Sequence, residues 1–146
     1  MKPLRSLFLS HGAPTLATSS HPANAFLREL GKTLPKPKAA IVVSPHWMTR
    51  GFPVKQADRY QAWHDFGGFP QELFEIEYPA PGSPALADRI QELLNVPIVM
   101  EENEWGIDHG AWSVLKYMYP NADVPVVQLS LDGSKSAREH YELAKQ

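Results

Sequence analysis

The sequence predicts an α/β protein with a mostly parallel central sheet and helices on both faces of that sheet. Short runs of consecutive apolar residues, typical of strands that are covered on both faces, recur along the chain. Between them lie segments in which apolar residues repeat at helical spacing. Strands that alternate with helices in this order favour parallel pairing, because each helix returns the chain to the same edge of the sheet.

Each element follows from its own local pattern. The predicted strands are 4–9, 39–44, 96–100 and 124–131. Asn24 is a candidate cap for a helix that runs toward Leu34, and Ser83 with Pro84 begins a helix that extends through Leu94. A helix over 112–119 ends before Pro120, and Ser134 caps a last helix that runs to Gln146. Between 45 and 84 the chain is rich in proline, and its apolar residues show little periodicity apart from a helical turn near 71–74.

Composition restricts the class of protein. The 146 residues fit one domain, and 43% of them are hydrophobic, which is enough for a packed core. The net charge is −2 with scattered Lys and Arg, which disfavours nucleic-acid binding. No apolar stretch is long enough to span a membrane and the N-terminus is a poor secretory signal, so we expect a cytoplasmic protein.

The end of the chain carries no helix-stop signal, since neither Gly nor Pro follows the last helical residues. Four predicted strands also make a small sheet with a vulnerable edge. We therefore expect residues 1–146 to be the N-terminal part of a single, truncated α/β domain.

Histidines follow three of the predicted strands. His11 comes directly after the first strand, His46 after the second, and His109 follows the third after a polar loop. If these strands are parallel, the three side chains converge at the carboxyl edge of the sheet, where open α/β sheets bind their ligands. With no cysteine in the chain, a metal site must use His, Asp or Glu. Imidazoles suit both zinc and ferrous iron, so the spacing predicts a metal site without choosing the metal.

Two neighbouring features have competing interpretations. Asp108 precedes His109, and the two can form an acid/base pair, or Asp108 can simply cap the following helix. The segment "WHDFGGFP" holds His64 and Phe66 beside a pair of glycines. Its aromatic side chains can wall a pocket for a flat ring, or they can form a small core of their own.

Four motifs together resemble those of the class III extradiol ring-cleavage dioxygenases, the LigB-like superfamily. They are "LFLSHGAPTL", "VVSPHW", "HDFGGFPQELFEIEYPAPGSP" and "DHGAWSVL", in that order. They are most similar to the branch that cleaves 4,5-DOPA. The sequence departs from that branch at Gly67, where the family commonly has an aromatic residue.

The resemblance implies a fold, an activity and a set of site residues. It implies that His11 and His46 bind one Fe(II) or Zn(II) ion, and that His109 is a catalytic residue near the substrate. It places His64 in the substrate pocket, and we expect Phe66 and Asp108 there too. The implied reaction opens a catechol ring with O2. The implied partners are therefore a small aromatic substrate and O2, with no nucleic acid or membrane and with homo-oligomerisation left open.

Two alternatives follow from the ligand count. The sequence shows no third metal ligand, so the chain can be inactive by itself or a non-catalytic module that binds peptides or proteins on the same fold. A histidine site also suits zinc-bound water, so a zinc-dependent hydrolase is a third interpretation.

Overall fold

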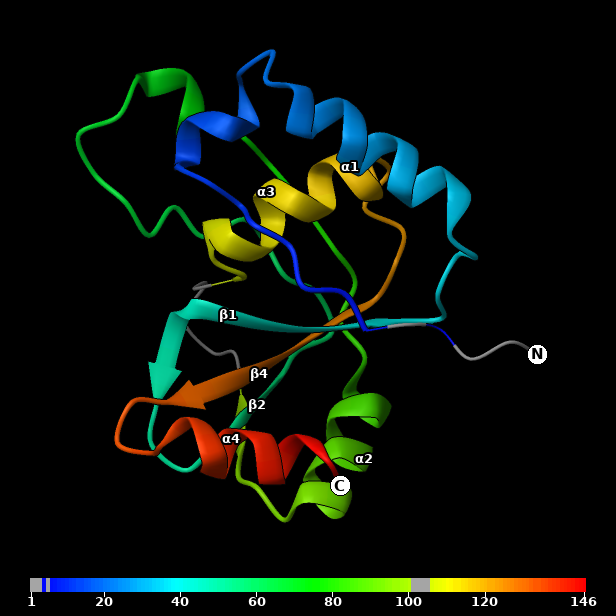
Figure 1. The fold of residues 1–146 in the computed structure, drawn as a ribbon, viewed down its shortest axis with the longest axis vertical. Helices are drawn as coiled ribbons and strands as arrows, with labels where there is room; N and C mark the ends of the chain where they lie inside the picture. The colour runs from blue at the N-terminus through cyan, green and yellow to red at the C-terminus, as the bar shows by residue number, and fades with distance from the viewer. Residues whose placement is uncertain (1–3, 5, 101–105) are drawn as a thin grey trace.

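The computed structural model describes Leu4, residues 6–100 and residues 106–146 (Figure 1). The strands are β1 Ala40–Thr49, β2 Val54–Gln56, β3 Ile98–Met100 and β4 Val126–Asp132. The α-helices are α1 Pro22–Thr33, α2 Pro84–Leu94, α3 His109–Met118 and α4 Ala137–Ala144. Two short 3₁₀ helices are η1 Pro14–Ala17 and η2 Gln71–Leu73.

The four strands form one mixed sheet in the order β1-β4-β2-β3. β1 pairs with β4 in parallel, and so does β2 with β3, whereas β2 and β4 are antiparallel. Helices α1 and α3 lie on one face of this sheet and α2 and α4 on the other (Figure 1). The predicted α/β class, with a mostly parallel sheet covered on both faces, is confirmed.

Two neighbouring residues of β4 show how the core is divided. Val126 and Val127 are both completely buried, but they point to opposite faces because successive side chains of a strand alternate. Val126 packs with Trp112 and Leu115 of α3, and Val127 packs with Ile90 of α2. A strand buried on both faces reads as a continuous apolar run, which is why the sequence predicted β4 closely.

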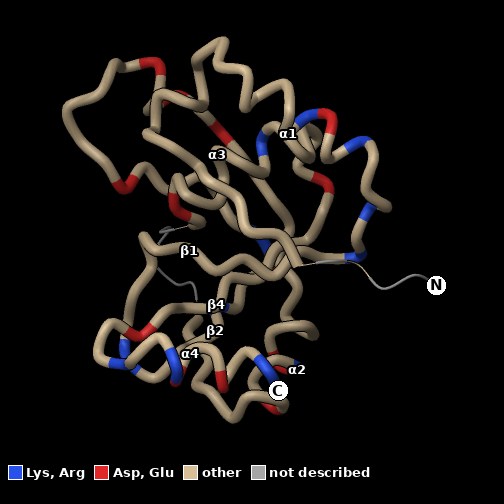
Figure 2. The backbone as a smooth tube through the Cα atoms, viewed as in Figure 1, with Lys and Arg blue, Asp and Glu red and all other residues tan. Residues whose placement is uncertain are grey.

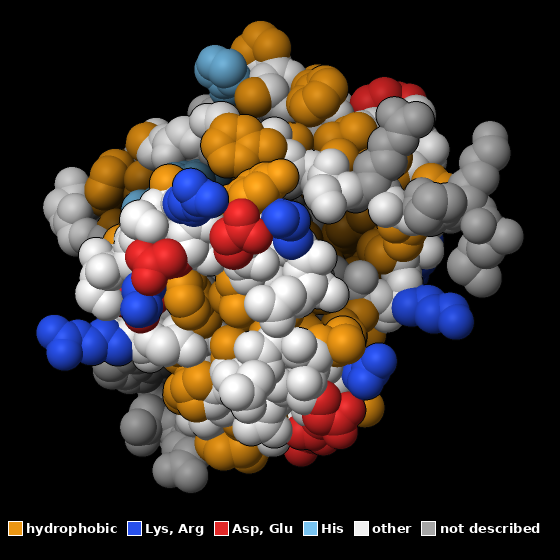
Figure 3. Space-filling view, turned by 60° about the horizontal axis from the view of Figure 1, so that its bottom comes forward, with side chains coloured by type: hydrophobic (Ala, Val, Ile, Leu, Met, Phe, Trp, Pro, Cys, Tyr) orange, Lys and Arg blue, Asp and Glu red, His pale blue; other side chains and the backbone are white. Residues whose placement is uncertain are grey.

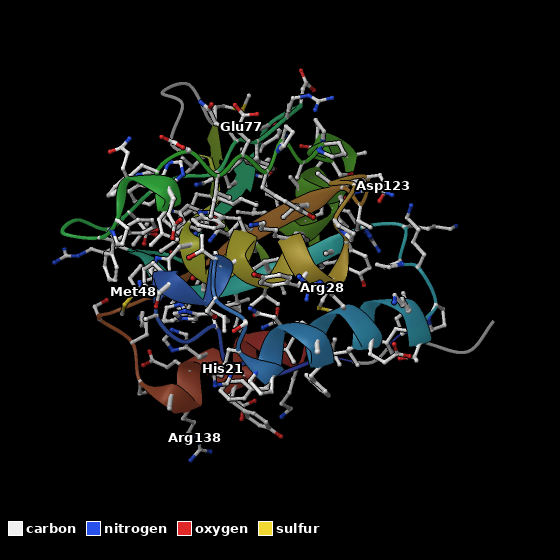
Figure 4. The ribbon with its side chains drawn as sticks, turned by 90° about the horizontal axis from the view of Figure 1, so that it is seen from above. His21, Arg28, Met48, Glu77, Asp123 and Arg138 are labelled. Atoms are coloured by element: carbon white, nitrogen blue, oxygen red, sulfur yellow. The ribbon has the colours of Figure 1, made fainter. Side chains whose placement is uncertain are left out.

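A further cluster of buried apolar residues joins α1 and α3, the two helices on the same face of the sheet. Leu27 of α1 packs against Val114 and Met118 of α3. Seen from above, α1 and α3 lie side by side over the sheet, with Arg28 labelled on α1 (Figure 4). The guanidinium carbon of Arg28 lies 4.6 Å from the centre of the Tyr117 ring, a cation–π contact between the two helices.

The predicted strand at 4–9 is wrong, since the described residues of that segment form no strand. Phe8 is fully exposed there, and Leu7 is 44% exposed. An apolar run indicates a preference for burial, but a strand also needs a hydrogen-bonding partner at its edge. β1 forms one edge of the sheet, and none of the described residues of this segment pairs with it.

The predicted parallel arrangement of the first three strands is also wrong. β3 is parallel to β2, and β2 is antiparallel to β4, so β3 runs opposite to β1. The reversal comes from β2, which the sequence did not reveal. Its central residue is a lysine, Lys55, which is 3% exposed and donates to the carbonyl of Gly106. A charged residue in a short strand hides the apolar pattern that reveals buried strands.

Two helix caps also differ from the prediction. The α1 helix begins at Pro22, and its cap is His21, whose Nδ1 accepts a hydrogen bond from the backbone of Ala23. Asn24 lies inside the helix, where its buried amide donates to the carbonyls of Leu16 and Ser19. The last helix, α4, is capped by Ser136 in a capping box with Glu139, not by Ser134. In both cases several capping residues lie close together, so sequence alone cannot choose among them.

The charges are distributed without a patch of one sign on the viewed surface. Figure 2 shows no charged residue on β1, whereas α1 carries both signs. On the face turned toward the viewer in Figure 3, Lys and Arg side chains alternate with Asp and Glu. Within the described residues, no helix combines the length and the apolar character that crossing a membrane requires.

Candidate metal centre

Three histidines from distant parts of the sequence meet above the end of β1. His11 lies in the segment before η1, His46 lies in β1, and His109 is the first residue of α3. One ring nitrogen from each lies within 4.8 Å of the others. The sequence predicted this convergence from parallel strands. The structure reaches it differently, because the start of α3 brings His109 to the site although β3 runs in the opposite direction.

His46 owes its position to an irregularity in β1. Val43 pairs with Leu129 and Met48 pairs with Leu131, so four residues of β1 lie opposite a single residue of β4. The sequence predicted that His46 follows the end of its strand. In the structure it lies inside β1. Bulges bend a strand and redirect its side chains, and they are common beside functional sites.

His11 lies next to a glycine that adopts a left-handed conformation. The φ angle of Gly12 is +62°, a region that residues with a side chain rarely occupy. Burial and the neighbouring His109 and His46 lower the pKa of His11, which favours the neutral imidazole that metals bind. Its Nδ1 is buried and has no hydrogen-bond partner among the described residues.

The separation of His11 and His46 fits a shared metal ion. Their Nε2 atoms lie 3.2 Å apart. Two imidazole nitrogens on one tetrahedral zinc ion, each at about 2.1 Å from the metal, lie about 3.4 Å apart. The two rings meet edge to face, with centroids separated by 4.8 Å. The donor set and its spacing therefore suit a borderline divalent metal such as zinc or ferrous iron.

His109 is held by a carboxylate that the sequence interpretation did not single out. Its Nδ1 lies 2.9 Å from Oδ1 of Asp65, and its backbone N–H donates to the same oxygen at 2.8 Å. Burial opposes ionisation of Asp65, but these hydrogen bonds outweigh it and hold the pKa of the carboxyl group below its ordinary value. Because Nδ1 is engaged, Nε2 is the nitrogen that His109 offers to the site.

Asp108 serves as the cap of α3, which was one of its two predicted roles. Its Oδ1 accepts hydrogen bonds from the backbone of Gly110 and from Ser44, and its Oδ2 accepts one from Gln128. The residue is completely buried. These bonds tie the start of α3 to β1 and β4, and a contact of Asp108 with substrate stays a prediction.

Gly110 leaves room for this arrangement. A Cβ atom at this position would lie 2.6 Å from the Ser44 hydroxyl and 3.0 Å from Cδ2 of His46. Only glycine therefore allows α3 to approach β1 so closely.

The segment "WHDFGGFP" contributes to the core and also reaches the histidines. Phe66 packs against Phe69, Phe74 and Trp112 in an aromatic cluster. Its ring also meets that of His109 edge to face at 5.5 Å. His64 contacts the same cluster, and its Nε2 lies 3.0 Å from the carbonyl of Ile76. Phe66 and Phe69 thus pack against the core, whereas the interpretation as a pocket wall and the substrate contacts of His64 and Phe66 stay predictions.

The comparison with known families matches nearly the whole chain. Residues 6–145 match the model of the catalytic LigB subunit of aromatic ring-opening dioxygenase. The chain belongs to the LigB family. The predicted resemblance to the LigB-like extradiol dioxygenases is therefore confirmed as membership of that family.

Known proteins similar to this LigB-family chain include two 4,5-DOPA dioxygenases and a solved structure. It is 50% identical over 141 residues to the 4,5-DOPA dioxygenase extradiol of Escherichia coli strain K12, covering 96% of this chain and 52% of that protein. It is 42% identical to the protein of the same name from Beta vulgaris, covering 96% and 54%. A crystal structure of an uncharacterized protein from Escherichia coli K12 matches with a TM-score of 0.64 and 47% identity, covering 82% of this chain and 44% of that one. The LigB-family chain thus spans about half the length of the relatives it matches.

Proposed function

We propose that this LigB-family chain carries the metal-binding half of an extradiol dioxygenase that opens the ring of a catechol such as DOPA with O2. The observation that supports the proposal most strongly is the meeting of three histidine nitrogens within 4.8 Å of one another. In the reaction, the ring bond beside the two hydroxyl-bearing carbons breaks and both oxygen atoms of O2 enter the product.

In this proposal His11 and His46 hold one Fe(II) or Zn(II) ion through their Nε2 atoms, which lie 3.2 Å apart. When bound, ferrous iron supplies a Lewis acid for the catechol oxygens and open positions where substrate and O2 can meet. Burial and the neighbouring histidines lower the pKa of His11, which favours the neutral imidazole that a metal ion binds.

His109 then acts on a proton of the substrate. Its Nδ1 is held by Asp65, so its Nε2 is free to accept the proton of a catechol hydroxyl group and to return a proton later. The same pairing of a carboxylate with Nδ1 keeps the base of a catalytic triad in the correct tautomer. The ring of Phe66, edge-on to His109, supplies an apolar wall suited to a flat aromatic substrate.

His109 has a second available role, because its free nitrogen is near enough to the other two for it to be a third metal ligand. The two roles make different predictions for His109→Ala. As an acid/base residue, its loss leaves metal affinity nearly unchanged and lowers turnover by about 10²–10⁴-fold. As a ligand, its loss weakens metal binding as much as the loss of His11 or His46.

The test is turnover by the metal-loaded protein. The full-length dioxygenase that contains this half is loaded with Fe(II) without oxygen, mixed with DOPA, and then exposed to O2 while the yellow ring-opened product is followed by absorbance. The 50%-identical Escherichia coli relative is the positive control, and His21→Asn, which keeps the cap of α1, is the control variant. A sample that binds one metal ion per chain and yet opens none of several catechols would contradict the proposal.

A further inference from the structure

Asp65 lies beside two of the three clustered histidines, hydrogen-bonded to His109 and within ion-pair distance of His46. One oxygen, Oδ1, accepts from the backbone of His109 at 2.8 Å and lies 2.9 Å from its Nδ1. The other oxygen, Oδ2, lies 3.7 Å from Nδ1 of His46. The side chain of Asp65 is only 8% exposed, so water competes little for these contacts.

The segment that carries Asp65 is fastened to the start of α3. Ala62 forms a bridge with Ile107, and the backbone N–H of Trp63 donates to the carbonyl of Ile107 at 2.8 Å. The indole of Trp112 in α3 donates to the carbonyl of Trp63 at 2.9 Å. These bonds fix the position of the carboxylate relative to His109.

The chemistry of a carboxylate determines which nitrogen of each ring carries the proton. An ionised carboxylate only accepts hydrogen bonds, so a ring nitrogen that faces it is favoured in the N–H form. A neutral imidazole has a single N–H, and the opposite nitrogen is then a bare acceptor that can bind a metal or a proton. Asp108 also lies near the site, but it cannot do this, because Ser44, Gly110 and Gln128 occupy its oxygens.

We propose that Asp65 is a positioning residue that sets the tautomers of both His46 and His109, so that each presents an unprotonated Nε2 to the site. Any effect of Asp65 on catalysis rests on the proposed function, whereas its effect on the tautomers does not. The proposal also determines which ring nitrogen of His11 carries its proton. With Nε2 of His46 bare, the 3.2 Å contact requires His11 to donate from its own Nε2 in the metal-free protein. Nδ1 of His11 is then bare as well, which agrees with its lack of a partner among the described residues.

The tautomers are read directly from long-range ¹H–¹⁵N spectra of the histidine rings in metal-free protein at about pH 8, above the ordinary pKa of histidine. For the wild-type protein we expect Nδ1–H on His46 and His109, and Nε2–H on His11. Asp65→Ala removes the acceptor, and we expect both His46 and His109 to become mixtures of tautomers.

Asp65→Asn separates the effect on His46 from the effect on His109, because it keeps the shape of the side chain. Its one carbonyl oxygen can still accept from His109, whereas its amide group would face Nδ1 of His46 and donate to it. We expect this variant to change the tautomer of His46 alone. Asp58→Asn, at an exposed aspartate of the same segment, is the matched control and leaves all three rings unchanged.

Metal affinity is the second measurement, made by titration with Zn(II). Partners that orient metal-binding histidines typically contribute 10–100-fold, so we expect both Asp65 variants to bind Zn(II) about 10–100-fold more weakly than wild type, and Asp58→Asn to bind normally. Wild-type tautomers and wild-type affinity in a folded Asp65→Asn protein would overturn the proposal. Since neither measurement uses a substrate, a failure of ring opening would count against the proposed function and not against this role of Asp65.

Discussion

The three clustered histidines differ in how firmly they are held. The His46 side chain is 34% exposed and that of His109 is 6% exposed, while His11 is intermediate. His109 is anchored by Asp65, whereas His11 depends on a turn at Gly12. Fixing a mobile side chain costs conformational entropy, so binding a metal ion costs more of this entropy at His11 and His46 than at a ring that is already anchored, such as His109.

Removal of either proposed metal ligand is the most direct test at this scale. We expect His11→Ala and His46→Ala each to weaken Zn(II) binding by at least about 100-fold, because each deletes a ligand and not merely its support. Isothermal titration of the folded proteins measures this. His21→Asn should bind as wild type does, and an equal loss in that variant would show that the effect is not specific to the cluster.

Gly110 gives a second prediction at the residue scale. Alanine normally favours a helix over glycine by about 1 kcal/mol, but here the new Cβ would meet the Ser44 hydroxyl at 2.6 Å and the His46 ring at 3.0 Å. We expect Gly110→Ala to lower the free energy of unfolding by about 1–3 kcal/mol and to weaken metal binding. Urea unfolding measures the first effect.

Gly67→Ala is the control for this change, because a Cβ there meets nothing within 4 Å. If Gly110→Ala were as stable as Gly67→Ala, the close approach of α3 to β1 would be wrong.

Among the helices and strands, the apolar pattern of the sequence predicted the elements that are buried. It did not predict which segments pair as strands or in which direction they run. β4 and α2 have strong apolar patterns, and the structure places them within two residues of the prediction. The segment 4–9 has an equally apolar pattern and forms no strand in its described part, because strand formation depends on a neighbour far away in the sequence. The same reason explains why the bulge around His46 and the reversal at β2 could not be predicted.

Asp132 at the end of β4 links three elements and gives a prediction about pH. Its carboxylate accepts from the backbone of Gly51, after β1, and from Ser134, before α4. These hydrogen bonds lower its pKa to about 2. A carboxyl group whose pKa is lowered by folding stabilises the folded state above its ordinary pKa, and this stabilisation is lost as the pH falls toward about 2.

We therefore expect Asp132→Asn to be less stable than wild type at pH 7 and to approach wild-type stability as the pH falls through the range from about 4 to about 2. Urea unfolding of both proteins at several pH values measures the difference. The exposed control Asp58→Asn should show no comparable convergence. A constant difference between wild type and Asp132→Asn at all pH values would mean that the charge of Asp132 is not what matters.

At the scale of the whole molecule, the candidate site joins parts of the chain that are far apart. The segment at His11, strand β1 and helix α3 each contribute one ring, and Asp65 adds a fourth segment. The sequence identified the three histidines because each follows a predicted strand and occurs in one of the motifs. It did not single out Asp65, although this residue lies between His64 and Phe66 in the quoted motif, because an aspartate in a loop is common and only its contacts reveal its role.

Because the site joins these segments, metal binding should stabilise the whole fold. A ligand that binds only the folded state, at 100 times its Kd, adds about 2.7 kcal/mol, which for a domain of this size raises the unfolding midpoint by about 5–10 °C. Differential scanning calorimetry with and without Zn(II) measures this shift, and a chelator should reverse it. The His46→Ala variant should show little or no shift. A shift of wild-type size in that variant would place the metal elsewhere.

The measurement that tests the central claim most directly is anomalous X-ray scattering from a crystal of the metal-loaded protein, recorded at the absorption edge of the metal. The expected result is a single ion bound to Nε2 of His11 and of His46, at about 2.0–2.2 Å from each. It includes a hydrogen bond between Nδ1 of His109 and Asp65, as in the metal-free protein. An ion bound elsewhere, or rings of His11 and His46 that point away from each other, would contradict it.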